Sequence, residues 1–304
     1  MKVAIIGECM LELSADSEKR YTMSYGGDTL NTAIYYSRLG GKAEYFTALG
    51  DDIYSNTMLE QWQAEGVGIS YVRTIANQMP GLYIINNDQN GERYFHYWRQ
   101  HAPARQLISQ FPDVLHQLHT FDLIFLSGIT LSLYNQSDLQ QLFSCLQHFR
   151  AKGGIVVFDN NYRLRNWKSV DDAQAVFKTM MAHTDIALIS FDDEVSMYGE
   201  HTPDECLVKW INAGVREVVI KNGESGCLLY VNELTSTISL PSVVKPVDTT
   251  AAGDSFNGAY LAAKLKGKTP HQCVNDAQIC ASIVIMHKGA IIDKSIDLTG
   301  ANNV

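Results

Sequence analysis

Short apolar runs alternate with helix-like patterns along most of the chain, and this alternation limits the folds that it can adopt. Each run is brief, and most end at Gly, Ser, Asp or Lys, as buried strands do; they cover Val3–Gly7, Ala43–Ala48, Leu123–Ser127, Ile155–Asp159, Ile186–Ser190 and Val218–Lys221. Helices are predicted for Thr29–Leu39, Ser137–Arg150, Val170–Ala182 and Pro203–Ala213. The order indicates a doubly wound α/β fold, with a mainly parallel sheet and helices on both faces. Such sheets bind ligands beyond the carboxyl ends of their strands.

Two pairs of strand-like segments break this pattern. Leu82–Asn86 and Arg93–Trp98 flank a segment that ends in Asn90-Gly91, and Asn-Gly is a strong hairpin signal. Leu11–Ser14 and Arg20–Ser24 form a second pair. Neither pair has a crossover helix, so we expect a small separate sheet that acts as a lid. The whole chain, residues 1–304, is predicted to be one α/β domain, with lid segments at about 11–24 and 82–98 inserted into it.

Composition excludes several classes of protein. The formal net charge of -9 and the pI of about 5.4 leave no basic footprint for nucleic acid. The first apolar run is too short for a signal peptide or a membrane span, so no membrane partner is expected. The six cysteines include no Cys-x-x-Cys pair. Scattered cysteines are typical of reduced thiols, and we expect a cytoplasmic protein.

The segment from Val247 to Tyr260 carries the clearest chemical signal. Its small residues give way to a helical pattern, so Ala251–Gly253 should form the N-terminus of a helix. Free backbone N–H groups and the helix dipole make such a terminus an anion site. Asp254 beside it has two interpretations. It is either an ordinary helix-capping residue or a general base next to a bound phosphate, and the residues alone leave both open.

Two motifs resemble the signatures of the ribokinase-like (PfkB) carbohydrate kinases. The first is Asp248-Thr249-Thr250-Ala251-Ala252-Gly253-Asp254-Ser255-Phe256, and the second is Gly26-Gly27-Asp28-Thr29-Leu30-Asn31-Thr32-Ala33, followed by Leu39-Gly40 and Leu49-Gly50-Asp51-Asp52. The resemblance implies that Asp254 is the catalytic base and that the amides of Ala251, Ala252 and Gly253 hold the transferred phosphoryl group. Ala251 stands where the family usually has Gly. Alanine still offers its N–H, so the anion site survives unless that position needs a positive φ.

The same resemblance implies ATP and Mg²⁺ as cofactors, with a monovalent cation as a further candidate. Lys221-Asn222-Gly223-Glu224-Ser225-Gly226 follows a predicted strand and resembles the nucleotide-binding turn of the family, although a plain strand-ending turn would look the same. The implied nucleotide-binding residues are Lys221, Gly223, Glu224, Ser225, Gly226, Ala251, Gly253 and Gln278. Glu194 matches the acid that organises Mg²⁺ through water, but Phe191 replaces the Asn of that motif.

Arginines near the predicted site bear on the substrate. Tyr97 and Arg99 share one face of a strand, a combination that suits a carboxylate, although a solvated edge strand would also carry an Arg. Arg163 follows a buried strand, where a surface salt bridge is the alternative. These segments resemble the bacterial 2-keto-3-deoxygluconate kinases of the family, which implies ATP-dependent 6-phosphorylation of the sugar acid 2-dehydro-3-deoxy-D-gluconate. The implied substrate-binding residues are Gly27, Asp28, Asn31, Tyr83, Tyr97, Arg99, Arg163 and Asp254.

Two other functions stay open from the sequence. One is phosphorylation of a neutral sugar, as in the fructokinases and ribokinases of this family, which would not need Arg99 facing the sugar. The other is a catalytically silent sugar or nucleotide sensor, against which the intact Asp254 argues. A homo-oligomer is also expected, as a dimer through the lid, because a small sheet with an exposed face is a natural contact surface.

Overall fold

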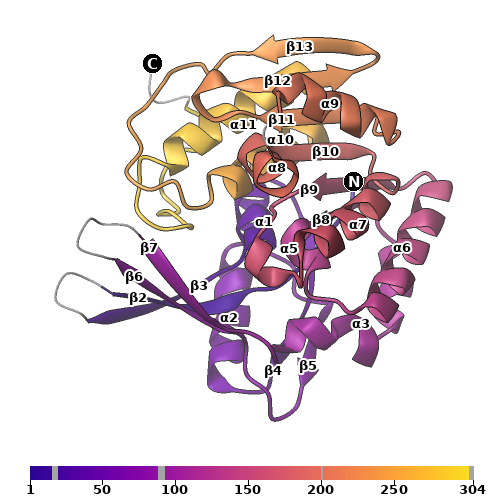
Figure 1. The fold of residues 1–304 in the computed structure, drawn as a ribbon. Coiled ribbons are helices and arrows are strands. Elements are labelled where there is room, and N and C mark those ends of the chain that lie inside the picture. The colour runs from indigo at the N-terminus through magenta and orange to yellow at the C-terminus, as the bar shows by residue number, and fades with distance from the viewer. Residues whose placement is uncertain (16–19, 88–92, 200, 301–304) are drawn as a thin grey trace.

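The computed structural model describes residues 1–15, 20–87, 93–199 and 201–300. Its main sheet has the strand order β13-β12-β11-β10-β9-β8-β1-β4-β5 within these residues (Figure 1). The strands are β1 (Val3–Ile6), β4 (Ala43–Gly50), β5 (Val72–Ile75), β8 (Leu123–Ser127), β9 (Ile155–Asp159), β10 (Ile186–Ser190), β11 (Glu217–Lys221), β12 (Cys227–Val231) and β13 (Leu234–Ile238). All neighbours from β5 to β11 pair in parallel, and β12 and β13 add an antiparallel edge. The predicted doubly wound sheet is confirmed.

Successive side chains of the central strands enter two different cores. On β1, Val3 and Ile5 pack into one core, and Ala4 and Ile6 pack into the other. This alternation is why the strands read as continuous apolar runs: both faces of the sheet are covered. The first core is closed by α1 (Asp28–Arg38), α2 (Ile53–Ala64), α10 (Ala252–Leu265) and α11 (Pro270–Val284). The second is closed by α3 (Leu107–Gln110), α4 (Asp113–Leu118), α6 (Gln136–Ala151), α7 (Val170–Met181), α8 (Phe191–Tyr198) and α9 (Pro203–Asn212).

Short elements complete the connections: η1 (Pro103–Gln106), α5 (Gly128–Leu131), η2 (Leu164–Asn166) and η3 (Gly223–Ser225). Several helices begin at residues that sequence rules favour. Thr269 caps α11 through a reciprocal pair with Gln272, and Pro270 occupies the first turn, where its missing N–H costs nothing. No helix in the described part of the chain is long and apolar enough to cross a membrane.

A second sheet, here called the lid sheet, projects from one side of the main domain (Figure 1). Its order is β3-β2-β6-β7, formed by β2 (Met10–Ala15), β3 (Tyr21–Gly26), β6 (Leu82–Asn87) and β7 (Arg93–Trp98). The expected separate small sheet is therefore present. Parallel pairing of β2 with β6 joins the two predicted strand pairs into one sheet. The predicted Asn-Gly turn lies outside the described residues.

The register of the lid sheet sorts its side chains onto two faces. Glu12 pairs with Tyr83, and Tyr83 pairs with Tyr97, so these three residues share one face. Leu13 pairs with Met23 on the opposite face, which also carries Trp98. The first face is polar and aromatic, and it belongs to the site described next. The second is mostly apolar.

Candidate active site

The predicted helix start is present at α10, and its backbone is unusual. Ala251 precedes the first helical residue with φ 59° and ψ 19°, which is the left-handed region. The family's glycine would adopt this conformation freely, whereas alanine is strained in it. Position 251 therefore does take the positive φ for which the sequence analysis made an exception. The segment before it is held by Asp248, whose carboxylate accepts hydrogen bonds from the amides of Thr250 and Gly289.

The amides expected to hold a phosphoryl group differ in availability. The Ala252 amide donates to the Thr249 carbonyl at 3.2 Å, so it is partly committed to the turn. The amides of Gly253 and Asp254 lie in the first turn of α10, where a helix supplies no backbone acceptor. A Cβ at Gly253 would lie 3.5 Å from Lys221 Nζ, so an ammonium group lies close to this helix start. Backbone amides and a cation together form an anion site.

Asp254 lies beside this anion site and is held by a residue from α1. Its Oδ2 accepts a hydrogen bond from Asn31 Nδ2 at 2.8 Å, across 223 positions of sequence. Burial raises the pKa of Asp254 from 3.8 to about 8; the carboxylates of Asp28 and Asp159 also raise it, and the Asn31 hydrogen bond and Lys221 lower it. The residue therefore has the pKa of a base suited to near-neutral pH, rather than that of a solvated cap.

The start of α1 brings polar groups against Asp254. Asp28 Oδ2 accepts from Asn161 Nδ2 at 2.8 Å, and burial raises the pKa of Asp28. A Cβ at Gly27 would lie 2.1 Å from the Glu8 carbonyl oxygen, so the close approach of two backbones requires glycine there. The Oδ1 atoms of Asn31 and Asn161 are buried and have no hydrogen-bond partner among the described residues. Buried acceptors without donors are costly, and ligand hydroxyls would satisfy them.

The lid sheet supplies aromatic rings at this site, and Arg99, expected on the strand, lies directly after β7 instead. The rings of Tyr83 and Tyr97 stack with centroids 5.6 Å apart. Arg165 lies over Tyr97 at 4.1 Å from the ring centroid and donates to its hydroxyl at 2.5 Å. Arg99 Nη2 lies 2.5 Å from Glu8 Oε2, and Glu8 is only 2% exposed. The guanidinium is thus held by a buried carboxylate, a partner that the sequence did not indicate.

Arg163 and the acidic residues after β10 form the next part of the site. Arg163 Nη1 lies 2.7 Å from Asp193 Oδ1. Burial raises the pKa of Asp193, the nearby Arg163 lowers it, Asp159 raises it and Lys221 lowers it. Asp193 therefore shares the electrostatic environment of Asp159 and Lys221.

Glu194, the residue expected to organise Mg²⁺, lies elsewhere. Its side chain is 1% exposed; Lys209 pairs with one oxygen, and Trp210 Nε1 donates to the other at 3.1 Å. The carboxylate is turned into the core between α8 and α9. Asp193 precedes Glu194 by one residue on α8, so its side chain points in a direction about 100° away around the helix axis. It therefore reaches the site instead of Glu194. We therefore move the proposed Mg²⁺ role from Glu194 to Asp193.

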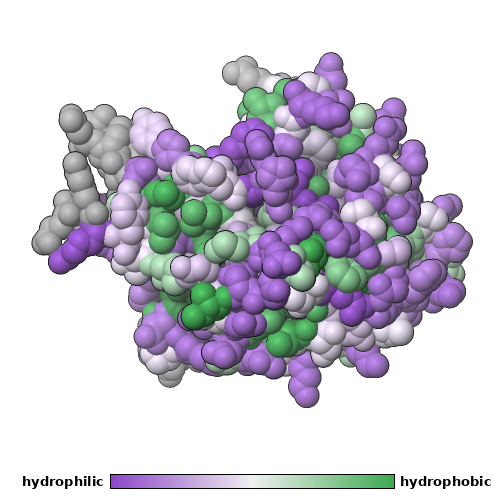
Figure 2. Space-filling model, turned by 90° about the horizontal axis from the view of Figure 1, so that it is seen from below, coloured by the Kyte–Doolittle hydropathy of each residue, from purple (hydrophilic) through white to green (hydrophobic). Residues whose placement is uncertain are grey.

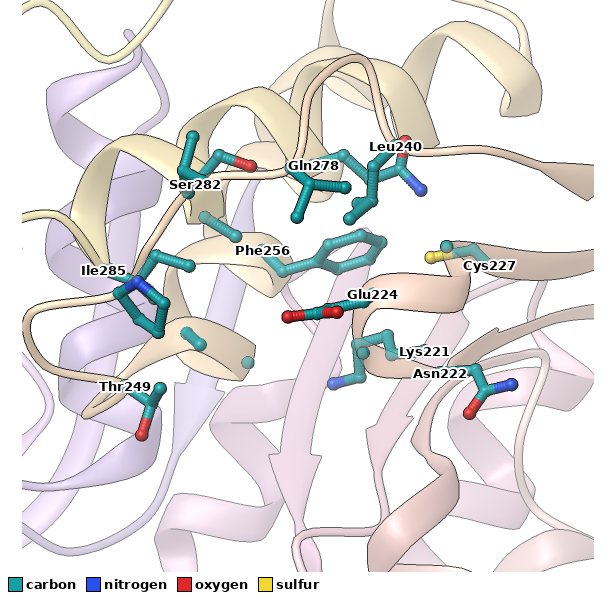
Figure 3. Close-up of a pocket in the computed structure, with 18 of the residues that line it drawn as sticks. Lys221, Asn222, Glu224, Cys227, Leu240, Thr249, Phe256, Gln278, Ser282 and Ile285 are labelled. Carbon is teal, nitrogen blue, oxygen red and sulfur yellow. The ribbon is translucent and has the colours of Figure 1, made fainter.

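A cavity of about 370 Å³ lies between η3, α10 and α11 (Figure 3). Figure 3 shows the Phe256 ring in its middle, Leu240 and Gln278 above it, and Lys221 and Thr249 at its lower end. Apolar side chains also line the cavity, including Val243, Val244, Ala281 and Ile285. Of the predicted nucleotide-binding residues, Lys221, Gly223, Glu224, Gly226, Gly253 and Gln278 line it, and Ser225 and Ala251 are not among the lining residues described. The cavity leads from an apolar slot to the anion site.

Lys221 closes the phosphate end of this cavity through a polar network. Its Nζ lies 3.4 Å from Asp159 Oδ1 and donates to Asn257 Oδ1 at 3.2 Å, and Asn257 Nδ2 donates to Asp159 Oδ2 at 2.8 Å. Gln278 Nε2 donates to the Ile238 carbonyl at 3.1 Å and leaves its own Oε1 buried without a partner among the described residues. Hard oxygen ligands are what Mg²⁺ prefers, so Asp159 and Asp193 fit a Mg²⁺-nucleotide.

Sequence reasoning missed several residues of this site: Glu8, Asn161, Asn257 and Arg165. Glu8 and Asn161 lie two residues after the ends of β1 and β9, and Arg165 lies in η2, two residues after the predicted Arg163. Asn257 lies one helical turn after Gly253, so the 3.6-residue period could have indicated that it faces the same ligand.

Comparison with known proteins defines the class. The profile of the pfkB family of carbohydrate kinases matches residues 1–297, and the chain belongs to this family. Among its relatives, the 2-dehydro-3-deoxygluconokinase of Dickeya dadantii is 43% identical over 95% of this chain and 96% of its own length. That of Haemophilus influenzae is 40% identical over 96% of each chain. A ribokinase II from Escherichia coli, solved in complex with ATP and Mg²⁺, has a TM-score of 0.83 at 22% identity and covers 95% of this chain and 94% of its own.

Proposed function

We infer that this protein is an ATP-dependent kinase of 2-dehydro-3-deoxy-D-gluconate and yields its 6-phosphate and ADP. The observation that carries the reaction is the position of Asp254 beside the start of α10, held by Asn31 and close to Lys221. The substrate rests on the 40–43% identity to 2-dehydro-3-deoxygluconokinases over nearly the whole chain. We further propose that residues 1–304 form one kinase domain with the two lid segments inserted.

In the proposed reaction, Asp254 accepts the proton of the 6-hydroxyl as the oxygen attacks the γ-phosphorus. The amides of Gly253 and Asp254 and the Lys221 ammonium stabilise the negative charge on the transferred group. Mg²⁺, bound with ATP, would neutralise phosphate charge and be held, directly or through water, by Asp159 and Asp193. The Lys221 ammonium and the Asn31 hydrogen bond favour the ionised form of Asp254, which is the form that accepts the proton.

Buried polar groups support a sugar acid as the substrate. The unpartnered Oδ1 atoms of Asn31 and Asn161 would accept from hydroxyls of the sugar. Arg99 and Arg163 offer guanidinium groups to its carboxylate, and the Tyr83 and Tyr97 rings cover it. Each guanidinium has five N–H donors, so it can bind the substrate carboxylate while it stays paired with Glu8 or Asp193.

The decisive experiment compares the protein with Asp254→Asn in a coupled assay of ADP release. Asparagine keeps an acceptor for Asn31 but cannot take a proton, and a positioned base contributes about 10²–10⁴-fold to rate. We expect turnover on the keto-deoxy acid to fall by that factor while ATP affinity, measured by calorimetry, stays near the original value. Wild-type activity on fructose or ribose but not on the acid would favour the neutral-sugar alternative. Unchanged turnover in Asp254→Asn would show that another group is the base.

Three further expectations belong to this proposal. We propose that the protein is cytoplasmic, and its six free, buried thiols support this location. A monovalent cation is tested in the same assay by exchanging K⁺ for a tetraalkylammonium ion. A homodimer through the lid is supported by the apolar outer face of the lid sheet, and Figure 2 shows apolar side chains gathered on the lid side of the molecule.

A further inference from the structure

Three potential metal ligands meet at the corner between α8 and α9, and none of them lines the cavity described above. Glu194 lies on α8, Cys206 lies on α9, and His201 lies in the connection. One ligand atom from each lies within 4.8 Å of the others. Glu194 and Cys206 are 1% and 0% exposed, and His201 is half-buried. We propose that this cluster binds one Zn²⁺ ion, with water as the fourth ligand.

The orientation of His201 is the observation that points to a ligand. Its Nδ1 lies 2.7 Å from the Gly199 carbonyl oxygen, and a carbonyl only accepts, so Nδ1 carries the proton. The lone pair of the neutral ring is therefore on Nε2. That atom is buried and has no hydrogen-bond partner among the described residues. Metal-bound histidines are commonly fixed in this way, with one nitrogen on a backbone carbonyl and the other on the metal.

The ligand types favour Zn²⁺ over Mg²⁺ or Ca²⁺. A thiolate, an imidazole and a carboxylate are common Zn²⁺ ligands, whereas the two harder ions prefer oxygen alone. Bond lengths of about 2.0–2.3 Å require the three ligand atoms to draw together slightly. The fourth position is assigned to water, because no other ligand residue is grouped with these three in the described part of the chain.

Lys209 is the competitor that the ion must replace. Its ammonium pairs with Glu194 and lies 3.3 Å from the centroid of the Tyr198 ring. Without metal, this lysine is the counter-ion of a buried carboxylate, which would otherwise be costly. The Lys209 side chain is 29% exposed, so it can turn outward when a divalent ion takes its place beside Glu194.

Binding also releases a proton. Burial raises the pKa of the Cys206 thiol, and Glu194 nearby raises it further, so the metal-free side chain is a neutral thiol. Zn²⁺ binds the thiolate, and the proton leaves to solvent as the Zn–S bond forms.

Cobalt substitution in the metal-stripped, full-length protein tests the site directly. Co²⁺ bound to a thiolate gives a charge-transfer band in the near ultraviolet, and Zn²⁺ should abolish the band at one equivalent per chain. We expect Cys206→Ser to lose the band, and His201→Phe to weaken Zn²⁺ binding by more than about 100-fold, the upper range for changes outside the first coordination shell. Lys209→Met should tighten binding, because the competing cation is gone.

Cys145→Ser is the matched control. Cys145 is also a buried thiol, and its Sγ lies 4.0 Å from His119 Nε2, but no carboxylate completes a cluster there in the described structure. This variant should keep the band. Zn²⁺ should also raise the melting temperature of the wild type but not of Cys206→Ser, which separates loss of the ion from misfolding. A wild type without the band, a band that survives Cys206→Ser, or unchanged affinity in Lys209→Met would overturn the proposal.

Discussion

Asp254 carries a carboxyl group that the fold makes difficult to ionise. Its pKa rises from 3.8 to about 8 through burial first and through neighbouring carboxylates second. Between these two values the folded chain binds more protons at this position than the unfolded chain does. Stability therefore falls as the pH rises through this window. The geometry that provides a base thus opposes folding at neutral and alkaline pH.

This linkage predicts the stability of Asp254→Asn without any ligand. Asparagine has no charge to bury, so the variant should be more stable than the wild type at pH 8 and gain much less at pH 5. Thermal melts at the two pH values measure the difference. In the wild type, kcat/KM should also rise with pH up to about 8, because the unprotonated base is the active form. A stability gain of the same size at both pH values would contradict the assigned pKa shift.

Arg99 needs a test that does not leave Glu8 alone in the interior. Arg99→Met by itself would abandon a buried carboxylate, so the informative pair is Glu8→Gln and the double variant Glu8→Gln/Arg99→Met. A charge-assisted hydrogen bond is worth about 1.5–3 kcal/mol. The double variant should thus have a KM for the keto-deoxy acid roughly tenfold to a hundredfold above that of Glu8→Gln.

A neutral sugar provides the control for this comparison, and its KM should change little. Equal losses on the acid and on the neutral sugar would assign Arg99 a structural role.

Helix α10 begins with a residue whose conformation costs stability. The left-handed backbone of Ala251 costs about 1–2 kcal/mol for a residue with a Cβ, and glycine avoids it but loses about 0.5–1 kcal/mol of additional chain entropy. Ala251→Gly should accordingly raise the free energy of unfolding by up to about 1 kcal/mol. The neighbour Ala252 lies in the helix, and Ala252→Gly should lower it by about 0.5 kcal/mol. Denaturant titrations compare the two variants, and losses in both would show that Ala251 is not strained.

The assembly of the whole molecule should depend on the outer face of the lid sheet. Tyr21, Met23, Tyr94 and Trp98 are each at least half exposed there, and an exposed apolar surface of this kind favours association. We predict that Met23→Glu combined with Trp98→Glu converts a dimer to a monomer in analytical ultracentrifugation. Leu234→Glu, at a still more exposed apolar position on the edge strand β13, is the control and should leave the mass unchanged. A wild-type protein that is monomeric at micromolar concentration would contradict the proposed dimer.

Much of the architecture could be read from local patterns. The predicted bounds of β8, β9 and β10 agree with the structure at both ends, because buried parallel strands are short apolar runs that end at polar residues. The bounds of the antiparallel lid strand β7 also agree. The start of α10 and its Asp254 were likewise visible in one contiguous motif. In contrast, β5 (Val72–Ile75) was missed, since an edge strand with two polar residues has no continuous apolar run.

The pairing of distant groups could not be read in this way. The Asn31–Asp254 bond spans 223 positions, and the buried Glu8–Arg99 pair joins the end of β1 to the segment after β7. Glu194 shows most clearly what sequence spacing does not determine. Its spacing matches a Mg²⁺ motif, but the orientation of α8 points its side chain into the core beside Lys209. Spacing along a chain indicates which residues belong to the same helix or strand. Which of them face one another depends on how helices rotate and how sheets pack, and that is settled by long-range burial.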